Sequence, residues 1–261
     1  MGQSVVKNRI IGVTGKGGSG KTAIVSMMIK LLSANNKVLA IDGDSAGGLS
    51  YTLGVKVNQT VGDIRKGMID DPEKRKEAKD VHIRQVVSKA LTEGNNFSLL
   101  VMGRSEGPGC YCNVNELLKY GIESLSKDFD VILIDCEAGP EQISRRMLEK
   151  ADLLVIVVDN SLRSIQVAGV IGKIAKDTQG KGFDRMGLVI NKYVQGEDTI
   201  VEAAKQLGLD IFGCVPQDRN ISDHDLSGKP LLELPDDSPS VVAVRGILGD
   251  MGLMNMSGKP R

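Results

Sequence analysis

The sequence predicts an α/β protein with a single doubly wound, mostly parallel sheet that carries helices on both faces. Short apolar runs alternate along the chain with longer stretches of helical periodicity, a pattern typical of buried parallel strands joined by right-handed helical crossovers. The chain has 261 residues, of which 41% are hydrophobic and 25% charged, as in an ordinary globular protein. We therefore expect a single domain over residues 1–261, with a flexible tail near 253–261.

The apolar runs and the periodic stretches define the expected elements in order. Strands are expected at 10–14, 38–41, 99–102, 131–134, 153–158, 188–190 and 211–215. Helices are expected near 21–33, 114–126, 141–149, 164–176, 199–207 and 241–251. Ligands of such sheets bind beyond the carboxyl ends of the strands, so the residues that follow each run are the candidate site.

Charge and hydropathy exclude several classes of partner. Lysine and arginine number 33, aspartate and glutamate also number 33, and aromatic residues make up 3%, so no overall attraction to nucleic acid or to an anionic membrane is expected. The longest apolar runs are of strand length and too short to cross a bilayer, and the first residues lack an export signal. We expect a cytoplasmic protein without a nucleic-acid or membrane partner.

A glycine-rich segment stands directly after the first run and opens a helix. It fits the phosphate-loop pattern GxxxxGK(S/T) and consists of Gly15, Lys16, Gly17, Gly18, Ser19, Gly20, Lys21 and Thr22. Glycines allow the backbone N–H groups to turn inward around phosphate oxygens, and the helix amino terminus adds the positive end of its dipole. We expect these residues to bind ATP or ADP, with Lys21 on the β- and γ-phosphates and Thr22 on Mg²⁺.

Lys16, the second residue of this loop, is not required by the phosphate cradle itself. It resembles the signature lysine of the deviant Walker A ATPases, the family of MinD, ParA, the nitrogenase iron protein and the arsenite pump ATPase. In that family the lysine reaches across a dimer interface to the nucleotide of the other subunit. The resemblance implies a P-loop NTPase with a MinD-like fold, a homodimer that closes around nucleotide, and Lys16 and Lys21 as catalytic residues.

Three carboxylates follow apolar runs at positions that the family uses for its switch and Walker B residues. Asp42 and Asp44 follow the second run, and Asp135 ends the fourth. The resemblance implies that Asp44 positions the attacking water, that Asp42 supports the magnesium site, and that Asp135 holds Mg²⁺ through water. Gly139 lies in the family's switch II and would donate a backbone N–H to the γ-phosphate and move when that phosphate leaves. A structural role of the acidic pair in a turn stays open.

Two later positions resemble the adenine-contacting segments of the same family. Asn191 follows the run at 188–190, and Pro216 follows the run at 211–215. The Asn191 amide would read the exocyclic amine of the base, and Pro216 would lie against the ring. Turn-forming residues after strands are also common, so a purely structural role stays open for both.

A Gly/Pro-rich loop after the third run presents two thiols one residue apart, Cys110 and Cys112. This spacing is too tight for an ordinary structural disulfide, and two thiolates do not complete a four-sulfur zinc site. Two such pairs that face each other across a two-fold axis would supply four sulfurs, which suit Zn²⁺, Ni²⁺, Cu(I) or an Fe–S cluster. Ligand type does not choose among these metals, and two idle cysteines in a turn remain the structural alternative.

The phosphate loop, the segment GPGCYC and the switch II segment with Ser144, Arg145 and Arg146 together resemble the CooC/AcsF branch of the MinD-type ATPases. Members of that branch assist nickel insertion into carbon monoxide dehydrogenase or acetyl-CoA synthase. The resemblance implies an ATP-hydrolysing metallochaperone in which Cys110 and Cys112 share Ni²⁺ (or Zn²⁺) across the dimer and a nickel enzyme is the client. Ser45 departs from the proline that often follows the switch I acid, which leaves the client open.

Three alternatives share much of this pattern. An iron–sulfur cluster carrier or redox ATPase would use the same cysteines, and a visible spectrum distinguishes it. A MinD/ParA-like positioning ATPase would need a basic amphipathic carboxyl-terminal helix or a basic patch, whereas the stretch 241–251 carries only Arg245 and Asp250 as charged residues. A zinc-tied dimer that only binds nucleotide would release no phosphate.

We expect Cys136 and Cys214 to be packing residues.

Overall fold

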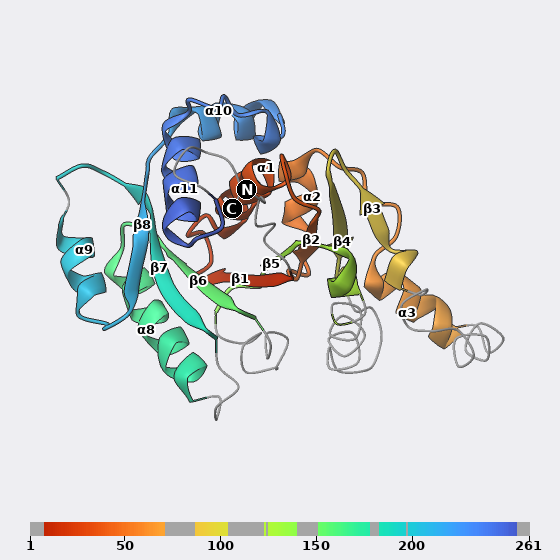
Figure 1. Ribbon diagram of the computed structural model, residues 1–261, viewed down its shortest axis with the longest axis horizontal. Helices are drawn as coiled ribbons and strands as arrows, with labels where there is room; N and C mark the ends of the chain where they lie inside the picture. The colour runs from red at the N-terminus through yellow and green to blue at the C-terminus, as the bar shows by residue number, and fades with distance from the viewer. Residues whose placement is uncertain are drawn as a thin grey trace, which may run out of the picture.

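The computed structural model describes residues 8–70, 87–103, 123, 125–139, 151–177, 183–196 and 198–254. They form one eight-stranded sheet in the order β3-β4-β2-β5-β1-β6-β7-β8 (Figure 1). All neighbouring strands pair in parallel except β3 and β4, which are antiparallel. The strands are β1 (Arg9–Gly15), β2 (Val38–Asp42), β3 (Leu91–Glu93), β4 (Phe97–Val101), β5 (Val131–Asp135), β6 (Leu153–Val158), β7 (Arg185–Tyr193) and β8 (Asp210–Pro216).

Helices cover both faces of this sheet (Figure 1). One face packs against α1 (Lys21–Leu32), α2 (Gly48–Leu53), α11 (Pro239–Asp250) and the short turn η2 (Leu231–Glu233), with α10 (Arg219–Ser227) beside them. The other face packs against α3 (Val61–Asp70), α8 (Leu162–Lys176) and α9 (Asp198–Lys205), and η1 (Ser126–Asp128) precedes β5. The expected α/β architecture is therefore confirmed.

The core consists of two apolar layers, one on each face of the sheet. Successive side chains of a strand point to opposite faces, so a strand covered on both sides must be apolar throughout. In β5, Val131 and Leu133 belong to the layer under α1, and Ile132 and Ile134 belong to the layer over α8. The continuous apolar runs in the sequence reflect this two-sided burial.

The strand predictions hold for all seven runs, with differences at the ends. β7 extends to Tyr193, so Asn191 and Lys192 lie within the strand and not after it, and Pro216 is the last residue of β8. The sequence did not predict β3, because three partly exposed residues give no apolar run. It also did not predict α2, α3 and α10, which are short or lack a continuous apolar stripe.

The carboxyl-terminal expectation requires a correction. Leu253 and Met254 are buried, with exposed fractions of 4% and 3%, and they pack in the layer that contains α1 and α11. The tail expected near 253 therefore does not begin there, and 255–261 lie outside the described residues. None of the described helices has the length and apolar character needed to span a bilayer.

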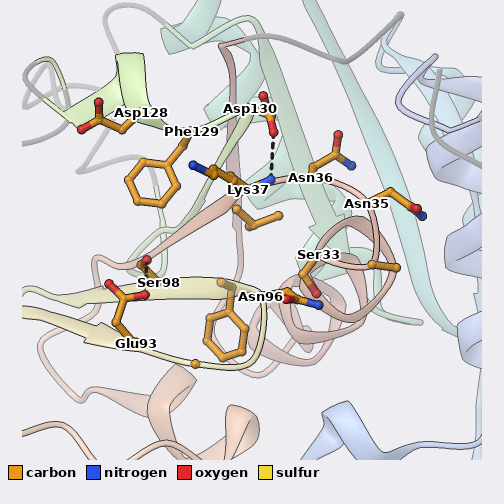
Figure 2. Close-up of a pocket in the computed structure, with 14 residues that line it drawn as sticks. Ser33, Asn35, Asn36, Lys37, Glu93, Asn96, Ser98, Asp128, Phe129 and Asp130 are labelled. Atoms are coloured by element: carbon orange, nitrogen blue, oxygen red, sulfur yellow. Dashed lines mark hydrogen bonds between the residues drawn. The ribbon is translucent and has the colours of Figure 1, made fainter. Parts of the chain in front are cut away.

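A pocket of about 630 Å³ opens at the amino-terminal edge of the sheet (Figure 2). Its lining comes from the loops that precede β2, β4 and β5 and includes Lys37, Glu93, Asp128 and Phe129. The phosphate loop follows β1 and lies at the opposite, carboxyl-terminal edge. The pocket is therefore separate from the site built below.

Candidate active site

The predicted phosphate loop joins the end of β1, which lies between β5 and β6 in the sheet, to the start of α1. Gly15 has a φ of 149°, and a Cβ there would lie 2.2 Å from the carbonyl oxygen of Val157. Gly20 has a φ of 90°, and a Cβ there would lie 2.2 Å from Nδ2 of Asn191. Side chains at these positions would force the loop away from its neighbours, so only glycine fits this cradle.

Two further residues of the loop are enclosed by the fold. Lys21, the first residue of α1, has an exposed fraction of 8%, and its Nζ lies 3.4 Å from the carbonyl oxygen of Lys16. Ser19 is fully buried, and its hydroxyl has no hydrogen-bond partner in the structure. The helix amino terminus and the Lys21 ammonium place positive charge beside the loop, where a polyphosphate would be stabilised.

Asp42 and Asp135 end neighbouring strands, and the register of β2 and β5 places them opposite each other. Their exposed fractions are 0% and 2%. Asp42 accepts hydrogen bonds from the N–H of Asp44 at 3.1 Å and from that of Leu49 at 2.8 Å. Burial raises the pKa of Asp42 to about 6 in spite of these hydrogen bonds. The structure therefore brings together the two carboxylates expected at the magnesium site.

Asp135 has the donor chemistry of a hard-cation site. Burial raises its pKa to about 7, against a hydrogen bond from the Thr22 hydroxyl and with a further contribution from the charge of Asp42. Its Oδ1 is buried without a hydrogen-bond partner. An uncompensated buried carboxylate costs free energy, and Mg²⁺ prefers one or two carboxylates together with substrate phosphates and water. The oxygens of Thr22 and Asp135 fit this ion.

Asp44 and Gly139 lie at the same edge of the sheet. Asp44 is partly exposed, and its Oδ1 accepts the N–H of Ala46 at 2.9 Å. The N–H of Gly139 donates to the carbonyl oxygen of Gly15 at 3.0 Å, and the carbonyl of Gly139 accepts the Thr14 hydroxyl at 3.1 Å. A contact between the Gly139 N–H and a γ-phosphate would require its bond to the phosphate loop to break first.

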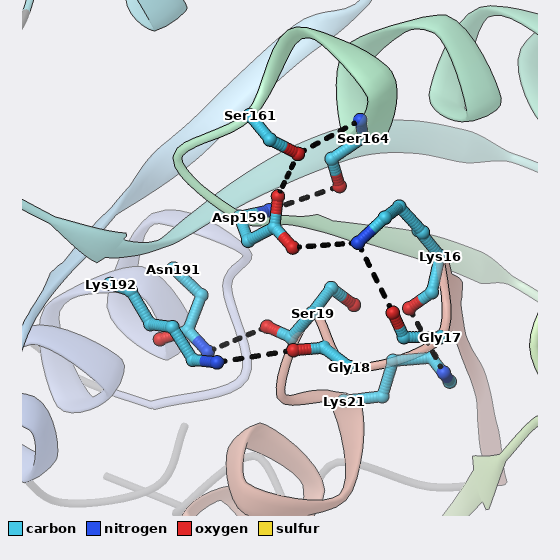
Figure 3. A network of polar contacts seen from close by, with 10 residues as sticks. All are labelled: Lys16, Gly17, Gly18, Ser19, Lys21, Asp159, Ser161, Ser164, Asn191 and Lys192. Carbon is cyan, nitrogen blue, oxygen red and sulfur yellow. Dashed lines mark hydrogen bonds and ion pairs between the residues drawn. The ribbon is translucent and has the colours of Figure 1, made fainter.

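The structure assigns Lys16 a partner in its own chain (Figure 3). Its Nζ lies 3.1 Å from Oδ2 of Asp159 and 3.2 Å from the carbonyl oxygen of Gly17. Asp159 follows β6, and its Oδ1 accepts the hydroxyl of Ser161 at 2.5 Å. Burial raises the pKa of Asp159, but the hydrogen bonds from Ser161 and Lys16 outweigh it and leave the pKa below its ordinary value. The ionised form of Asp159 is therefore stabilised by the Lys16 ammonium and the Ser161 hydroxyl.

Asn191 and Lys192 contact the phosphate loop from β7 (Figure 3). Nδ2 of Asn191 donates to the carbonyl oxygen of Ser19 at 2.9 Å, and Nζ of Lys192 donates to that of Gly18 at 3.1 Å. Pro216 ends β8, the strand paired with β7. The amide expected to read the base thus bonds to the loop in this structure, whereas Pro216 remains a candidate base contact.

The predicted soft-metal site lies outside the described residues, as do Cys110, Cys112, Ser144, Arg145 and Arg146. Within the described ranges, no group of three or more His, Cys, Asp or Glu side chains could hold a metal ion. Cys136 is buried, and burial holds its thiol pKa far above its usual range, while Cys214 is partly buried. These two thiols are packing residues, as expected.

Sequence reasoning missed two residues of the site, Asp159 and Lys192. Asp159 directly follows the apolar run of β6, so the rule that placed Asp42 and Asp135 also pointed to it. Lys192 adjoins Asn191, but no motif marked its side chain. In the sequence, both residues are marked only as polar residues at the carboxyl end of a strand. That position does not indicate what either side chain does.

Comparisons with known proteins agree with this geometry. Residues 10–231 match the family described as the CobQ/CobB/MinD/ParA nucleotide binding domain. The chain is 40% identical over 235 residues to an uncharacterized ATP-binding protein of Methanocaldococcus jannaschii, covering 88% of this chain and 92% of that protein. It is 31% identical over 240 residues to the carbon monoxide dehydrogenase accessory protein CooC of Rhodospirillum rubrum, covering 86% of this chain and 89% of that protein.

A solved structure extends the comparison to the fold. The septum site-determining protein MinD of Pyrococcus horikoshii, complexed with Mg-ADP, matches with a TM-score of 0.71 at 25% identity, covering 93% of this chain and 95% of that one. The chain therefore belongs to the CobQ/CobB/MinD/ParA family of nucleotide-binding proteins and is an ATPase of that family.

Proposed function

We propose that this ATPase is a metallochaperone that dimerises around ATP and delivers nickel to carbon monoxide dehydrogenase or acetyl-CoA synthase. The observation that carries the proposal is the pair Cys110 and Cys112 in a glycine-rich stretch of sequence, in a chain that is 31% identical to CooC along most of its length. Two thiolates from each subunit supply the soft ligands that Ni²⁺ or Zn²⁺ accepts, and a two-fold axis completes the set.

The described residues support the nucleotide half of this proposal. The loop Gly15 to Thr22 would cradle the phosphates, with Lys21 on the β- and γ-phosphates. Thr22 and Asp135 would hold Mg²⁺, which neutralises phosphate charge when bound, and Asp42 would support that site. Asp44 would orient the water that attacks the γ-phosphate.

Lys16 would connect nucleotide to dimerisation. In the single chain its ammonium pairs with Asp159. In the closed dimer it would leave this carboxylate and contact phosphate oxygens bound by the other subunit. Hydrolysis would then change the free energy of the dimer and with it the affinity of the shared metal site, since nucleotide acts on the metal only through a state that binds it differently.

A MinD/ParA-like positioning ATPase is the second candidate, and the match to MinD over 93% of the chain supports it. Such a protein would use the same nucleotide cycle, but the cycle would control its attachment to a surface. Metal binding distinguishes the two candidates, because a positioning ATPase has no need of the paired thiols.

The test compares metal binding by the unchanged protein with that of the double variant Cys110→Ser/Cys112→Ser. Equilibrium dialysis against Ni²⁺ and Zn²⁺, with ADP or a non-hydrolysable ATP analogue, gives the metal bound per chain. We expect tight binding that the double variant loses while its ATP affinity stays unchanged.

Cys214→Ser is the matched control, since it removes a partly buried thiol that lies far along the chain from Cys110 and Cys112. We expect it to bind metal like the unchanged protein. Equal metal binding by the double variant would remove the metallochaperone proposal and favour the positioning ATPase. A broad visible absorption of the purified protein would instead favour the iron–sulfur alternative.

A further inference from the structure

The carboxyl end of β7 departs from regular strand geometry. Its register with β8 shifts between Ile190 and Tyr193, and Lys192 has a φ of 58°, in the left-handed region that disfavours side chains. Neighbouring side chains of a regular strand point to opposite faces, and a bulge redirects them. Such a conformation is unfavourable for a non-glycine residue and persists only where surrounding contacts impose it.

The consequence of this bulge is that two consecutive side chains reach the same loop (Figure 3). Asn191 donates to the carbonyl oxygen of Ser19 at 2.9 Å, and Lys192 donates to that of Gly18 at 3.1 Å. Asn191 has an exposed fraction of 5%, and the space beside its Nδ2 exists only because residue 20 is glycine.

These two contacts fix the orientation of two peptide units in the phosphate loop. A trans peptide unit is planar, and its C=O and N–H point in opposite directions. A bond to the carbonyl of Ser19 therefore directs the N–H of Gly20 to the other side of the loop. A bond to the carbonyl of Gly18 does the same for the N–H of Ser19, which donates to the carbonyl of Lys16 at 3.2 Å.

We propose that Asn191 and Lys192, together called the β7 brace, are positioning residues that hold the phosphate loop ready for a nucleoside triphosphate. In this role Asn191 acts on the phosphates through the loop by way of its Nδ2, which adds to the base contact expected from the sequence. The inference rests on the proposed role of the loop and is independent of the metal. A brace lowers the ordering cost of the loop on binding, so its loss weakens all triphosphates equally.

The test measures the affinities of ATP and inosine triphosphate, each with Mg²⁺, by calorimetry. Inosine triphosphate carries the same phosphates but lacks the exocyclic amine. Lys192→Gly removes the ammonium and tolerates the left-handed backbone, and Asn191→Ala removes the amide. We expect each variant to bind both nucleotides about tenfold more weakly, because each loses one hydrogen bond to the loop.

Two further variants separate positioning from a structural role. Lys192→Arg keeps a cationic donor, and we expect its affinities to stay within about threefold of those of the unchanged protein. Lys205→Ala removes an exposed lysine that pairs with Glu202 on α9, and we expect no change. The melting temperature of the nucleotide-free Lys192→Gly protein should stay within about 2 °C of the original.

Several results would overturn the brace. Unchanged affinities in Lys192→Gly would remove Lys192 from the site. A loss for ATP but not for inosine triphosphate in Asn191→Ala would return Asn191 to base reading. A lower melting temperature without rescue by Lys192→Arg would reduce the contact to a structural one. Failure of the loop assignment itself would appear separately, as normal ATP binding by Lys21→Ala.

Discussion

The ammonium of Lys16 lies 3.1 Å from Oδ2 of Asp159, in the same chain. The side chains are 33% and 15% exposed, so water screens the pair only in part. The family resemblance implies that Lys16 acts on the nucleotide of the other subunit. The ion pair shows where this lysine lies in the single chain, and it must break for the proposed contact across the dimer to form.

We predict that Asp159→Asn strengthens dimerisation in the presence of a non-hydrolysable ATP analogue. The variant removes a charge pair that stabilises only the single chain, and a partly exposed ion pair contributes about 0.5–1 kcal/mol. Two such pairs are lost in the symmetric dimer, one from each chain, so the dimer dissociation constant should fall about five- to thirtyfold. Analytical ultracentrifugation over a range of protein concentrations measures this constant.

Asp236→Asn is the control for this prediction, because it removes an exposed carboxylate that pairs with Lys30. Its dimer dissociation constant should equal that of the unchanged protein. A weaker dimer in Asp159→Asn would mean that Asp159 contributes to the dimer interface, and the proposed competition for Lys16 would then be wrong.

Lys21→Ala should abolish ATP turnover. Lys21 is buried at the start of α1, where its charge would stabilise the phosphates in the transition state, and loss of such a charge lowers kcat by at least about a hundredfold. Phosphate release under saturating ATP measures the effect. Lys30→Ala, in the last turn of the same helix, should retain turnover, and an active Lys21→Ala protein would contradict the loop assignment.

Asp218 predicts how stability changes in acid. It lies two residues after Pro216. Its carboxylate accepts hydrogen bonds from the hydroxyls of Ser238 and Ser240 and from the N–H groups of Ser240 and Asn220. Burial raises its pKa, but these hydrogen bonds outweigh it and lower the pKa to about 2. Because the folded pKa lies below the unfolded value, the ionised carboxylate stabilises the fold above about pH 4, and this stabilisation is lost as pH falls through about 2.

Urea unfolding of Asp218→Asn across this range measures the contribution. The pKa difference corresponds to about 2 kcal/mol at neutral pH, which screening by solvent reduces to about 1 kcal/mol. The deficit of the variant should shrink between pH 4 and pH 2. Asp223→Asn, on the exposed side of α10, should show no deficit, and a deficit of Asp218→Asn that is constant with pH would contradict the assignment.

The sequence predicted the parts of the site that a single motif or a continuous apolar run defines. The phosphate loop and the buried ends of β2 and β5 belong to this class, because two-sided burial makes such strands uniformly apolar and marks a charged residue at their end. The positions of Asp42 and Asp135 therefore followed from the pattern, and their roles at a magnesium site came from the family resemblance. The register that pairs Asp42 with Asp135 is a property of the folded sheet.

Contacts between distant segments were not predictable in the same way. Lys16 and Asp159 are 143 positions apart, and the loop carbonyls that Asn191 and Lys192 contact are more than 170 positions away from them. The bulge that directs both side chains depends on pairing with β8. Short elements such as α2 were missed because tertiary packing, and not local propensity, stabilises them.

Native mass measurement of the protein with Ni²⁺ and a non-hydrolysable ATP analogue tests the central claim most directly. The proposed function predicts a dimer with bound nucleotide and one nickel ion shared by two chains, and it predicts a dimer without nickel for Cys110→Ser/Cys112→Ser. Nickel bound to single chains, or nickel retained by the double variant, would contradict the shared thiol site and the transfer function built on it.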